Sequence, residues 1–358
     1  GYGRFGKKVN MKNAPVFPEQ YDHKQILLGD LDGDGQADIA FIENNKINLY
    51  VNQSGNSFSS GVKIANTPRI YNLNAIRICD IRGTGQAGVL WRCGPESGTQ
   101  GKMYFLDMTK GNKPYVLEEM NNNMGSLTRV VYGSSVYHFL RDQLNIITRL
   151  KTQLPFPVQV VNKVEVLDLL SGGKLVTKYN YHNGYWDGVE REFRGFAHVD
   201  SKDTESFERF NVQDLFSNES VNTISTEFYN PPTLTKSWFY VGPVGDGFSR
   251  WKEPDFSDEY WNGDANVLQR PVTLIDLLDA LPRRARRDAL RTLRGTLLRS
   301  ELYGLDGSDI QNTPYTVTES LMNLRTEFNP SLLPNPLWAE TSGYASGGGY
   351  IFFPFNIA

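Results

Sequence analysis

One short loop carries the residues of this chain that are best suited to chemistry. Aspartates stand at positions 1, 3, 5 and 9 of the loop over residues 30–38, and glycines lie between them at positions 4 and 6. Calcium takes six to eight hard oxygen ligands in flexible geometry, and a glycine-kinked loop lets alternate carboxylates face inward. A backbone carbonyl near Gln36 can complete the shell. The loop therefore predicts a calcium site formed by Asp30, Asp32, Asp34, Gln36 and Asp38.

Two other interpretations of this loop are weaker. The aspartates alone would make Asx turns at a solvated hairpin, but that leaves the filling of all four ligand positions unexplained. An EF-hand needs a bidentate Glu at position 12 and helices on both sides. Position 12 is Phe41, and both flanks are typical of strands. We therefore prefer calcium in a strand-flanked loop.

The elements around the loop recur about fifty residues later. In the first unit an apolar run at 26–29 precedes the loop, and short strands are expected at 39–42 and 46–51. The second unit repeats this order, with runs or strands at 75–79, 89–92 and 102–106. Its loop keeps Asp80 but has Arg82, Thr84 and Gly88 at the other ligand positions, so we expect Arg82 to pair with Asp80 and no metal to bind. Short strands at this period are typical of propeller blades.

The chain between residues 129 and 203 changes to longer alternating strands. Residues 174–181 place Leu175, Thr177, Tyr179 and Tyr181 on one face. The Asp187-Gly188 pair then predicts a tight hairpin turn, because both turn positions favour positive φ. This stretch is expected to form a two-sided β-sheet.

One helical region is expected over residues 272–299. Leucines at 274, 277, 278 and 281 follow helical spacing before Pro282 interrupts. The basic segment that follows, residues 283–294, is expected to be the solvated face of a helix whose Leu290, Leu293 and Leu297 pack inward. A nucleic-acid surface is the alternative, but no interleaved aromatics support it. Residues 342–358 are either a strand without its partners or an end artefact.

Composition excludes several classes of protein. The 358 residues are 39% hydrophobic and 22% charged, with a formal net charge of −3, which is globular and argues against nucleic-acid binding. No apolar run is long enough to span a bilayer. The two cysteines, Cys79 and Cys93, are expected to be unpaired core thiols rather than a disulfide. The first residues do not resemble a signal peptide, and we expect the chain to be a fragment.

No catalytic constellation is evident in the sequence. Asp187, Glu190 and Glu192 could be offered as glycosidase carboxylates, but ion pairing with Arg191 and Arg194 is the simpler account. The four histidines, His23, His138, His182 and His198, show no metal-ligand spacing along the chain. No nucleophile elbow, P-loop or dinucleotide fingerprint occurs. We therefore expect a protein that is not an enzyme.

Several motifs together resemble known families. The aspartate loop followed by NQSGNSF at 52–58 resembles the FG-GAP, or VCBS, propeller repeat of integrin-like proteins. Five further stretches are similar to the B component of bacterial insecticidal toxin complexes, the Tc toxins, and occur in the same order. They are MNNNMG at 120–125, LPFP at 154–157, GYWDGVEREFRGF at 184–196, LLRSELYG at 297–304 and PYTVTES at 314–320.

This resemblance implies a fold and a role. The fold would be mainly β: the last blades of an FG-GAP propeller over residues 1–128, then a Rhs/YD-type β-shell over 129–330 with a helical stretch near 272–299, and a poorly defined tail over 331–358. The propeller would dock on the channel-forming A component and gate it. The shell, completed by the C component, would enclose a toxic polypeptide. The protein would be secreted, with no nucleic-acid partner and no direct membrane insertion. The alternative is a calcium-dependent adhesion or carbohydrate-binding propeller.

Overall fold

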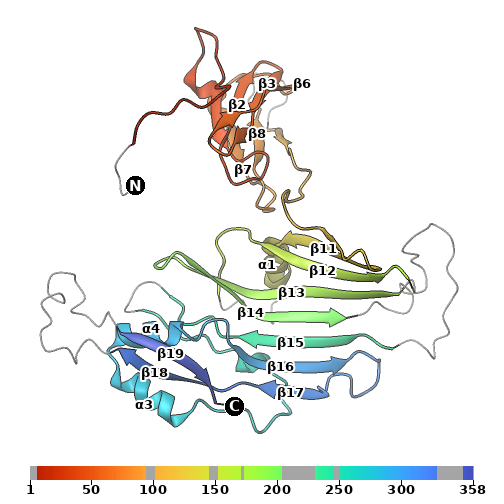
Figure 1. The fold of residues 1–358 in the computed structure, drawn as a ribbon, viewed down its shortest axis with the longest axis vertical. Coiled ribbons are helices and arrows are strands. Elements are labelled where there is room, and N and C mark those ends of the chain that lie inside the picture. The colour runs from red at the N-terminus through yellow and green to blue at the C-terminus, as the bar shows by residue number, and fades with distance from the viewer. Residues whose placement is uncertain are drawn as a thin grey trace, which may run out of the picture. The chain divides into compact units, whose positions relative to one another are not determined.

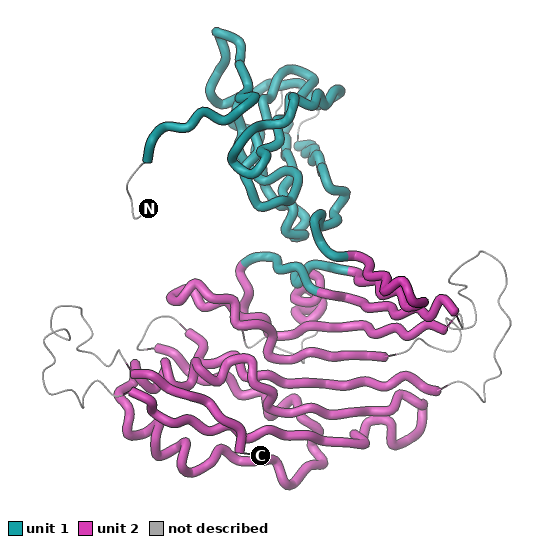
Figure 2. The backbone as a smooth tube through the Cα atoms, in the orientation of Figure 1, with its two compact units in different colours: residues 1–117, 132–136, 156–160 teal, residues 118–131, 137–155, 161–358 magenta. Residues whose placement is uncertain are grey.

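A computed structural model describes residues 6–93, 101–144, 152–170, 173–203, 230–245, 250–328 and 350–357. The chain forms two compact units (Figure 2). The first comprises residues 1–117 with 132–136 and 156–160, and the second comprises 118–131, 137–155 and 161–358. Each unit is treated separately below.

The first unit contains two small antiparallel sheets, one from each predicted repeat. The four-stranded sheet has the order β1 (Ile26–Gly29), β2 (Asp38–Glu43), β3 (Lys46–Tyr50) and β6 (Val62–Ala65). The three-stranded sheet consists of β7 (Ile76–Cys79), β8 (Gly88–Arg92) and β9 (Met103–Leu106). A two-stranded ribbon pairs β4 (Asn52–Gln53) with β5 (Ser57–Phe58), and single turns of 3₁₀ helix, η1 (His23–Gln25) and η2 (Leu73–Ala75), precede β1 and β7.

One apolar core serves both sheets of this unit. Ile47 and Leu49 on β3 are buried with Ile76 on β7 and Val89 and Trp91 on β8. Alternation along each short strand directs these side chains to one face, as the sequence pattern predicts. The strands expected in both repeats are thereby confirmed. The described residues show these two sheets and not a closed propeller. Cys79 and Cys93 are both free, as expected, but they are half-buried rather than in the core.

The second unit is built on an eight-stranded sheet whose strands follow one another in chain order (Figure 1). Its long central strands pair antiparallel: β13 (Lys174–Asp187) and β14 (Glu192–Asp203) pair from Thr177↔Asp203 to Asp187↔Glu192, with a shift in register between Gly184 and Trp186. The order is β10 (Glu119–Asn121), β11 (Ser126–Ser134), β12 (Gln159–Asp168), β13 (Lys174–Asp187), β14 (Glu192–Asp203), β15 (Thr233–Phe239), β16 (Leu297–Gly304) and β17 (Thr316–Glu319).

A helix interrupts the region where only strands were expected. Helix α1 (Ser135–Leu144) lies between β11 and β12. Its buried side chains are polar, namely Ser135, His138 and Asp142, whereas Leu140 and Leu144 are exposed. A periodic spacing of hydrophobic residues is the main sequence signal for a helix. The fully buried residues of α1 are polar and do not provide that signal. The helix therefore could not be predicted from that signal.

The expected helical region is in fact two helices followed by a strand. Helix α3 (Val272–Ala280) and helix α4 (Arg283–Arg291) are separated at Leu281 and Pro282, which are both extended. A proline cannot donate an intrahelical hydrogen bond and biases the residue before it to extended backbone. After a turn that includes Gly295 at φ +80°, the chain enters β16 at Leu297, so the expectation of helix to residue 299 was too long.

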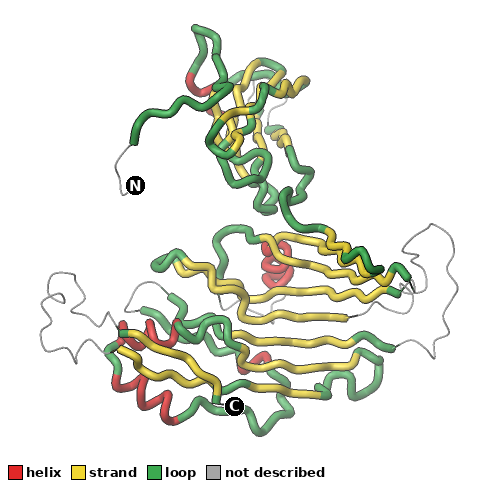
Figure 3. The backbone as a smooth tube through the Cα atoms, viewed as in Figure 1, coloured by secondary structure: helices red, strands yellow, loops and turns green. Residues whose placement is uncertain are grey.

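A second apolar core lies around α3 and α4, which Figure 3 shows as helices beside the hairpin of β18 (Met322–Phe328) and β19 (Ile351–Asn356). Leu274 and Leu278 of α3 and Leu290 of α4 are buried together with Leu324 and Phe352. The last two belong to this hairpin. Part of the tail therefore does have a strand partner, while residues 329–349 lie outside the described structure. A single 3₁₀ turn, η5 (Ser257–Glu259), precedes α3, and no described helix is both long and apolar enough to cross a membrane.

Candidate functional site

The first aspartate loop connects β1 to β2 and folds around its own carboxylates. Asp30 accepts hydrogen bonds from the backbone N–H groups of Gly33 at 2.7 Å and Gly35 at 2.9 Å. Both glycines have φ near +90°, at +84° and +90°, a backbone region that side chains rarely tolerate. Asp38, at the start of β2, is fully buried and accepts from Leu31, Asp32 and Asn52. Loop and strand are thus held together by carboxylate oxygens.

Three of the predicted ligands converge. One carboxylate oxygen each from Asp30, Asp32 and Asp38 lies within 4.8 Å of the others. Asp34 is not in this group: its carboxylate accepts from the backbone and side chain of Gln36 at 2.7 and 3.2 Å. Burial raises the pKa of Asp38, and the nearby charge of Asp32 adds to the increase.

The converging carboxylates suit a hard cation. Calcium prefers carboxylate and carbonyl oxygens and tolerates irregular geometry, and here backbone carbonyls or water would have to supply the remaining ligands. Two groups that sequence reasoning missed also reach this loop from the segment after β9. Lys113 Nζ donates to the Gly33 carbonyl at 2.6 Å, and the Tyr115 hydroxyl donates to Asp32 at 3.2 Å. The Lys113 charge offsets part of the repulsion among the aspartates.

The second loop, between β7 and β8, keeps the turn but not the carboxylates. Asp80 accepts from the backbone of Thr84 and Gly85, as Asp30 does from its own glycines. We expected Arg82 to pair with Asp80. It instead forms an ion pair with Asp107, just after β9. Burial by itself raises the pKa of Asp107, but hydrogen bonds from the Arg82 guanidinium and the backbone together outweigh burial and lower the pKa. The half-exposed Arg82 side chain thus extends out of the loop, while the loop backbone already satisfies Asp80.

A buried ion-pair network surrounds the hairpin between β13 and β14. Asp187 ends β13, and its Oδ1 accepts from the backbone of Val189 and Glu190 in the turn, at 2.9 and 3.1 Å. Its Oδ2 accepts from Arg194 of β14 and, at 2.7 Å, from Arg287 of α4. The three charged side chains are at most 1% exposed. The turn spans residues 188–191, so the hairpin is confirmed but its predicted two-residue Asp-Gly turn is wrong, because the Asp187 carboxylate closes a longer one.

The basic segment of α4 completes this network. Arg287 also contacts Glu190 at 3.0 Å, and Glu192 receives Arg291 at 3.1 Å and Arg294 at 2.7 Å. The expected solvated face is therefore largely an interface with an acidic hairpin, although Leu290 and Leu293 do pack inward as predicted. The expected pairing with Arg194 is present, but the described structure shows no ion pair of Arg191, and most partners of the hairpin acids come from α4 rather than from the sheet.

This network also tests the alternative that the hairpin carboxylates act as a glycosidase pair. Asp187 is buried against two guanidinium groups, and Glu190 and Glu192 are ion-paired. A general acid needs a carboxyl that can reach a substrate oxygen and hold a proton near neutral pH. Asp187 cannot reach a substrate because its side chain is 1% exposed against two guanidinium groups, and Glu190 is held by Arg287 and Arg291, so the two do not form a catalytic pair in a cleft.

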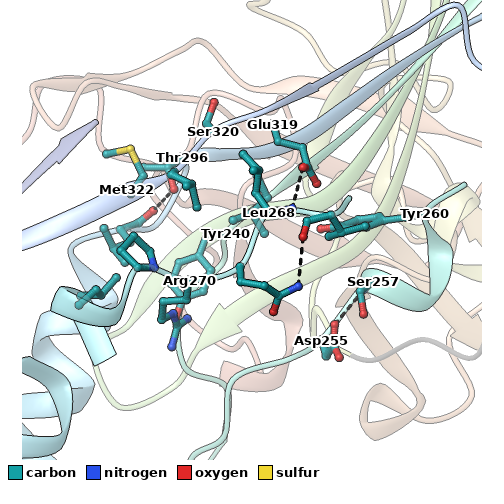
Figure 4. A pocket seen from close by; sticks show the side chains of 17 residues that line it. Tyr240, Asp255, Ser257, Tyr260, Leu268, Arg270, Thr296, Glu319, Ser320 and Met322 are labelled. Carbon is teal, nitrogen blue, oxygen red and sulfur yellow. Dashed lines mark hydrogen bonds between the residues drawn. The ribbon is translucent and has the colours of Figure 1, made fainter. Parts of the chain in front are cut away.

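A cavity of about 360 Å³ lies in the second unit near α3, with Tyr240, Arg270 and Glu319 among its lining residues (Figure 4). Its charged groups are already engaged with each other or with neighbours. Arg270 makes two contacts with Glu253, at 3.0 and 2.6 Å, and Glu319 pairs with Arg299 at 2.8 Å. Burial strongly raises the pKa of Tyr240, which keeps its hydroxyl protonated. The charged lining side chains Arg270 and Glu319 are therefore held by partners, Glu253 and Arg299, that do not line the cavity.

Two aspartate-loop repeats in one unit and a long antiparallel sheet in the other define a mainly β protein. Comparison with known families assigns it further. Residues 52–223 match the insecticide toxin TcdB middle/N-terminal region, and residues 288–331 match the TcdB middle/C-terminal region. A search of curated proteins finds no match.

Solved structures agree with this assignment. The crystal structure of TcdB2-TccC3-Cdc42 matches with a TM-score of 0.76 and 28% identity, over 99% of this chain and 15% of that one. The Photorhabdus luminescens Tc holotoxin pore carrying the mutation TccC3-D651A matches with a TM-score of 0.72 and 30% identity, over 91% of this chain and 14% of that one. The TcdB2-TccC3 crystal structure matches with a TM-score of 0.72 and 29% identity, over 91% and 15%.

The chain belongs to the TcdB family of insecticidal toxin components. The family resemblance drawn from its motifs is thereby confirmed. The chain spans about one seventh of the length of the structures that it matches.

Proposed function

We propose that this chain is a non-catalytic scaffold and delivery segment of a secreted bacterial toxin complex. The observation that carries the proposal is the match over 99% of the chain to a TcdB2-TccC3 structure, together with the two family regions in their expected order. In this proposal the first unit belongs to a propeller that docks on a channel-forming A component and gates it. The eight-stranded sheet is a wall of the shell that encloses a toxic polypeptide with the C component.

The other two functions considered have less support. An adhesion or carbohydrate-binding propeller gains nothing from the comparisons, because the matched regions downstream of residue 52 are those of TcdB. A polysaccharide-active enzyme would need free carboxylates, and those of the hairpin are held in ion pairs.

A chimera tests the scaffold proposal. This chain would replace the matching stretch of TcdB2, and the chimera would be co-expressed with TccC3. We expect the two proteins to co-purify and to co-elute in size-exclusion chromatography, as does unmodified TcdB2 with TccC3. TcdB2 with the stretch deleted is the control, and we expect it not to bind. A chimera that is folded by circular dichroism yet elutes without TccC3 would contradict the proposal.

We also propose that the loop over residues 30–38 binds one calcium ion, with Asp30, Asp32 and Asp38 as carboxylate ligands. The convergence of their oxygens supports this, and Asp34 and Gln36 lie beside them in the same loop. In a propeller blade the ion would hold the β1–β2 turn closed by neutralising three neighbouring carboxylates.

Calorimetric titration with calcium checks the loop. We expect one site in the unmodified chain and its loss in Asp32→Asn, which keeps the side-chain shape but removes a charged ligand. Asp80→Asn in the second loop is the matched control and should leave the heat unchanged. Absence of heat in a folded, unmodified chain would mean that the aspartates act only as turn residues.

A further inference from the structure

Two histidines that are separated in the sequence lie side by side on neighbouring strands, β13 and β14, of the eight-stranded sheet. The register of β13 and β14 places His182 directly opposite His198, and their rings stack with centroids 4.7 Å apart. Asp200 follows His198 by two residues, so its side chain lies on the same face of β14. Its carboxylate lies 3.0 Å from His198 Nε2 and 3.4 Å from His182 Nε2. One donor atom from each residue lies within 4.8 Å of the other two.

The atoms that converge here are buried, and no well-aligned hydrogen bond joins them, although Asp200 forms ion pairs with both rings. His182 Nε2, His198 Nε2 and Asp200 Oδ1 have no partner of acceptable hydrogen-bond geometry, although they are close to one another. A buried polar atom left in this state costs stability and calls for an explanation such as an ion. Three such atoms meeting at one point share a single explanation if a cation lies between them.

The other nitrogen of each ring is held by a carboxylate. His182 Nδ1 lies 2.7 Å from Asp142 of α1, and His198 Nδ1 lies 3.1 Å from Glu259 of η5. Glu259 is itself fixed by the Trp238 indole N–H at 3.1 Å. A carboxylate on one ring nitrogen is the usual support of a metal-ligating histidine, because it fixes the N–H there and leaves the other lone pair for the metal.

The geometry points to a zinc site in which His182, His198 and Asp200 are the protein ligands. We propose that His182 Nε2, His198 Nε2 and one Asp200 oxygen bind the ion and that water completes its shell. Two imidazoles and one carboxylate are a ligand set that zinc favours, whereas calcium and magnesium prefer oxygen alone. The bound ion would link β13 to β14 and, through Asp142 and Glu259, fix α1 and η5 against them.

The local charge also suits a divalent cation. Asp142, Asp200 and Glu259 bring three carboxylates to the cluster, and Arg141, which contacts Asp142 at 3.2 Å, brings one guanidinium. Because zinc binds the neutral imidazole and a carboxylate, zinc uptake at this site is expected to fall as the pH is lowered.

Zinc titration of the chelator-treated 358-residue chain tests the proposal. At mildly alkaline pH we expect one zinc per chain, and we expect His198→Gln and Asp200→Asn each to weaken binding by more than about 100-fold. Asp142→Asn, which removes the carboxylate that supports His182 and also weakens the pair with Arg141, should weaken it by about 10–100-fold. His23→Gln, at an exposed histidine, and Asp32→Asn, in the calcium loop, are the controls and should bind zinc as the unmodified chain does.

X-ray absorption of the zinc-loaded, unmodified chain gives a second readout that does not depend on the folding of the variants. Two imidazole nitrogens in the zinc shell are expected. A folded chain that takes up no zinc, a zinc shell without imidazole, or a folded His198→Gln that binds as tightly as the unmodified chain would each overturn the proposal. Loss of calcium binding in Asp32→Asn with zinc binding intact would separate this site from the aspartate loop.

Discussion

Replacing Asp187 with asparagine is expected to destabilise the second unit by about 3–5 kcal/mol, the cost of removing one partner of a buried ion pair. The substitution keeps the shape of the side chain but leaves Arg194 and Arg287 without their shared carboxylate, and both guanidinium groups are at most 1% exposed. Burial lowers the pKa of Arg194 and the Asp187 charge raises it, so the charged arginine depends on this partner. Urea unfolding followed by tryptophan fluorescence measures the loss.

Glu119→Gln is the matched control for Asp187→Asn. Glu119 pairs with Arg129 on the same sheet, but their side chains are 51% and 46% exposed, so the change should cost about 0–1 kcal/mol. Equal effects of the two substitutions would show that the buried network contributes no more than a surface pair. If Asp187→Asn yields no folded protein, Glu190→Gln, which weakens the part-exposed contacts to Arg287 and Arg291, should give a smaller, measurable loss.

Arg299→Ala is expected to be similarly damaging, at about 3–5 kcal/mol, because it leaves a buried carboxylate uncompensated. Arg299 and Glu301 on β16 both have side chains that are 0% exposed, and they are joined at 2.7 Å. The same guanidinium reaches Asp264 and Glu319, each at 2.8 Å. Its loss would therefore loosen β16, β17 and the loop before α3 together. Thermal unfolding by circular dichroism detects the change.

Two further variants make the Arg299 prediction specific. Arg299→Lys keeps the charge but replaces the planar guanidinium fork with a compact ammonium, which does not reproduce the donor geometry that reaches Glu301, Asp264 and Glu319, so we expect an intermediate loss. Arg325→Ala breaks an exposed pair with Glu327 and should have little effect. A fully stable Arg299→Ala would mean that Glu301 is satisfied by the hydrogen bonds that it accepts from Tyr303 and Trp261 alone.

The ion pairs of α4 connect the two parts of the chain that match the family. Glu192 lies within the first matched region, and its partners Arg291 and Arg294 lie within the second. The long motif at 184–196 and the basic helix are thus one structural unit in space. The two matched stretches, although separate in the sequence, are therefore held together by charged contacts.

Local patterns in the sequence were enough to predict much of this protein. The two aspartate loops, the short strands beside them and the β13–β14 hairpin depend on turn chemistry and alternation over a few residues, and these signals lie wholly within the segment that they describe. The motif order was enough to predict the family, because a motif requires no knowledge of its neighbours in space.

Only the tertiary structure decided which distant groups meet. Helix α1 buries a polar face whose partners lie on β12 and β13, so its own sequence carries no apolar period. The local sequence pattern predicts that the arginines of α4 lie on a solvated helix face. Arg287 is instead buried against Asp187, which is about a hundred residues away in the sequence. His182 and His198 have no ligand spacing along the chain, and they become neighbours through the register of two strands. Burial and charge pairing depend on what folds back against a segment, and that information is spread over the whole chain.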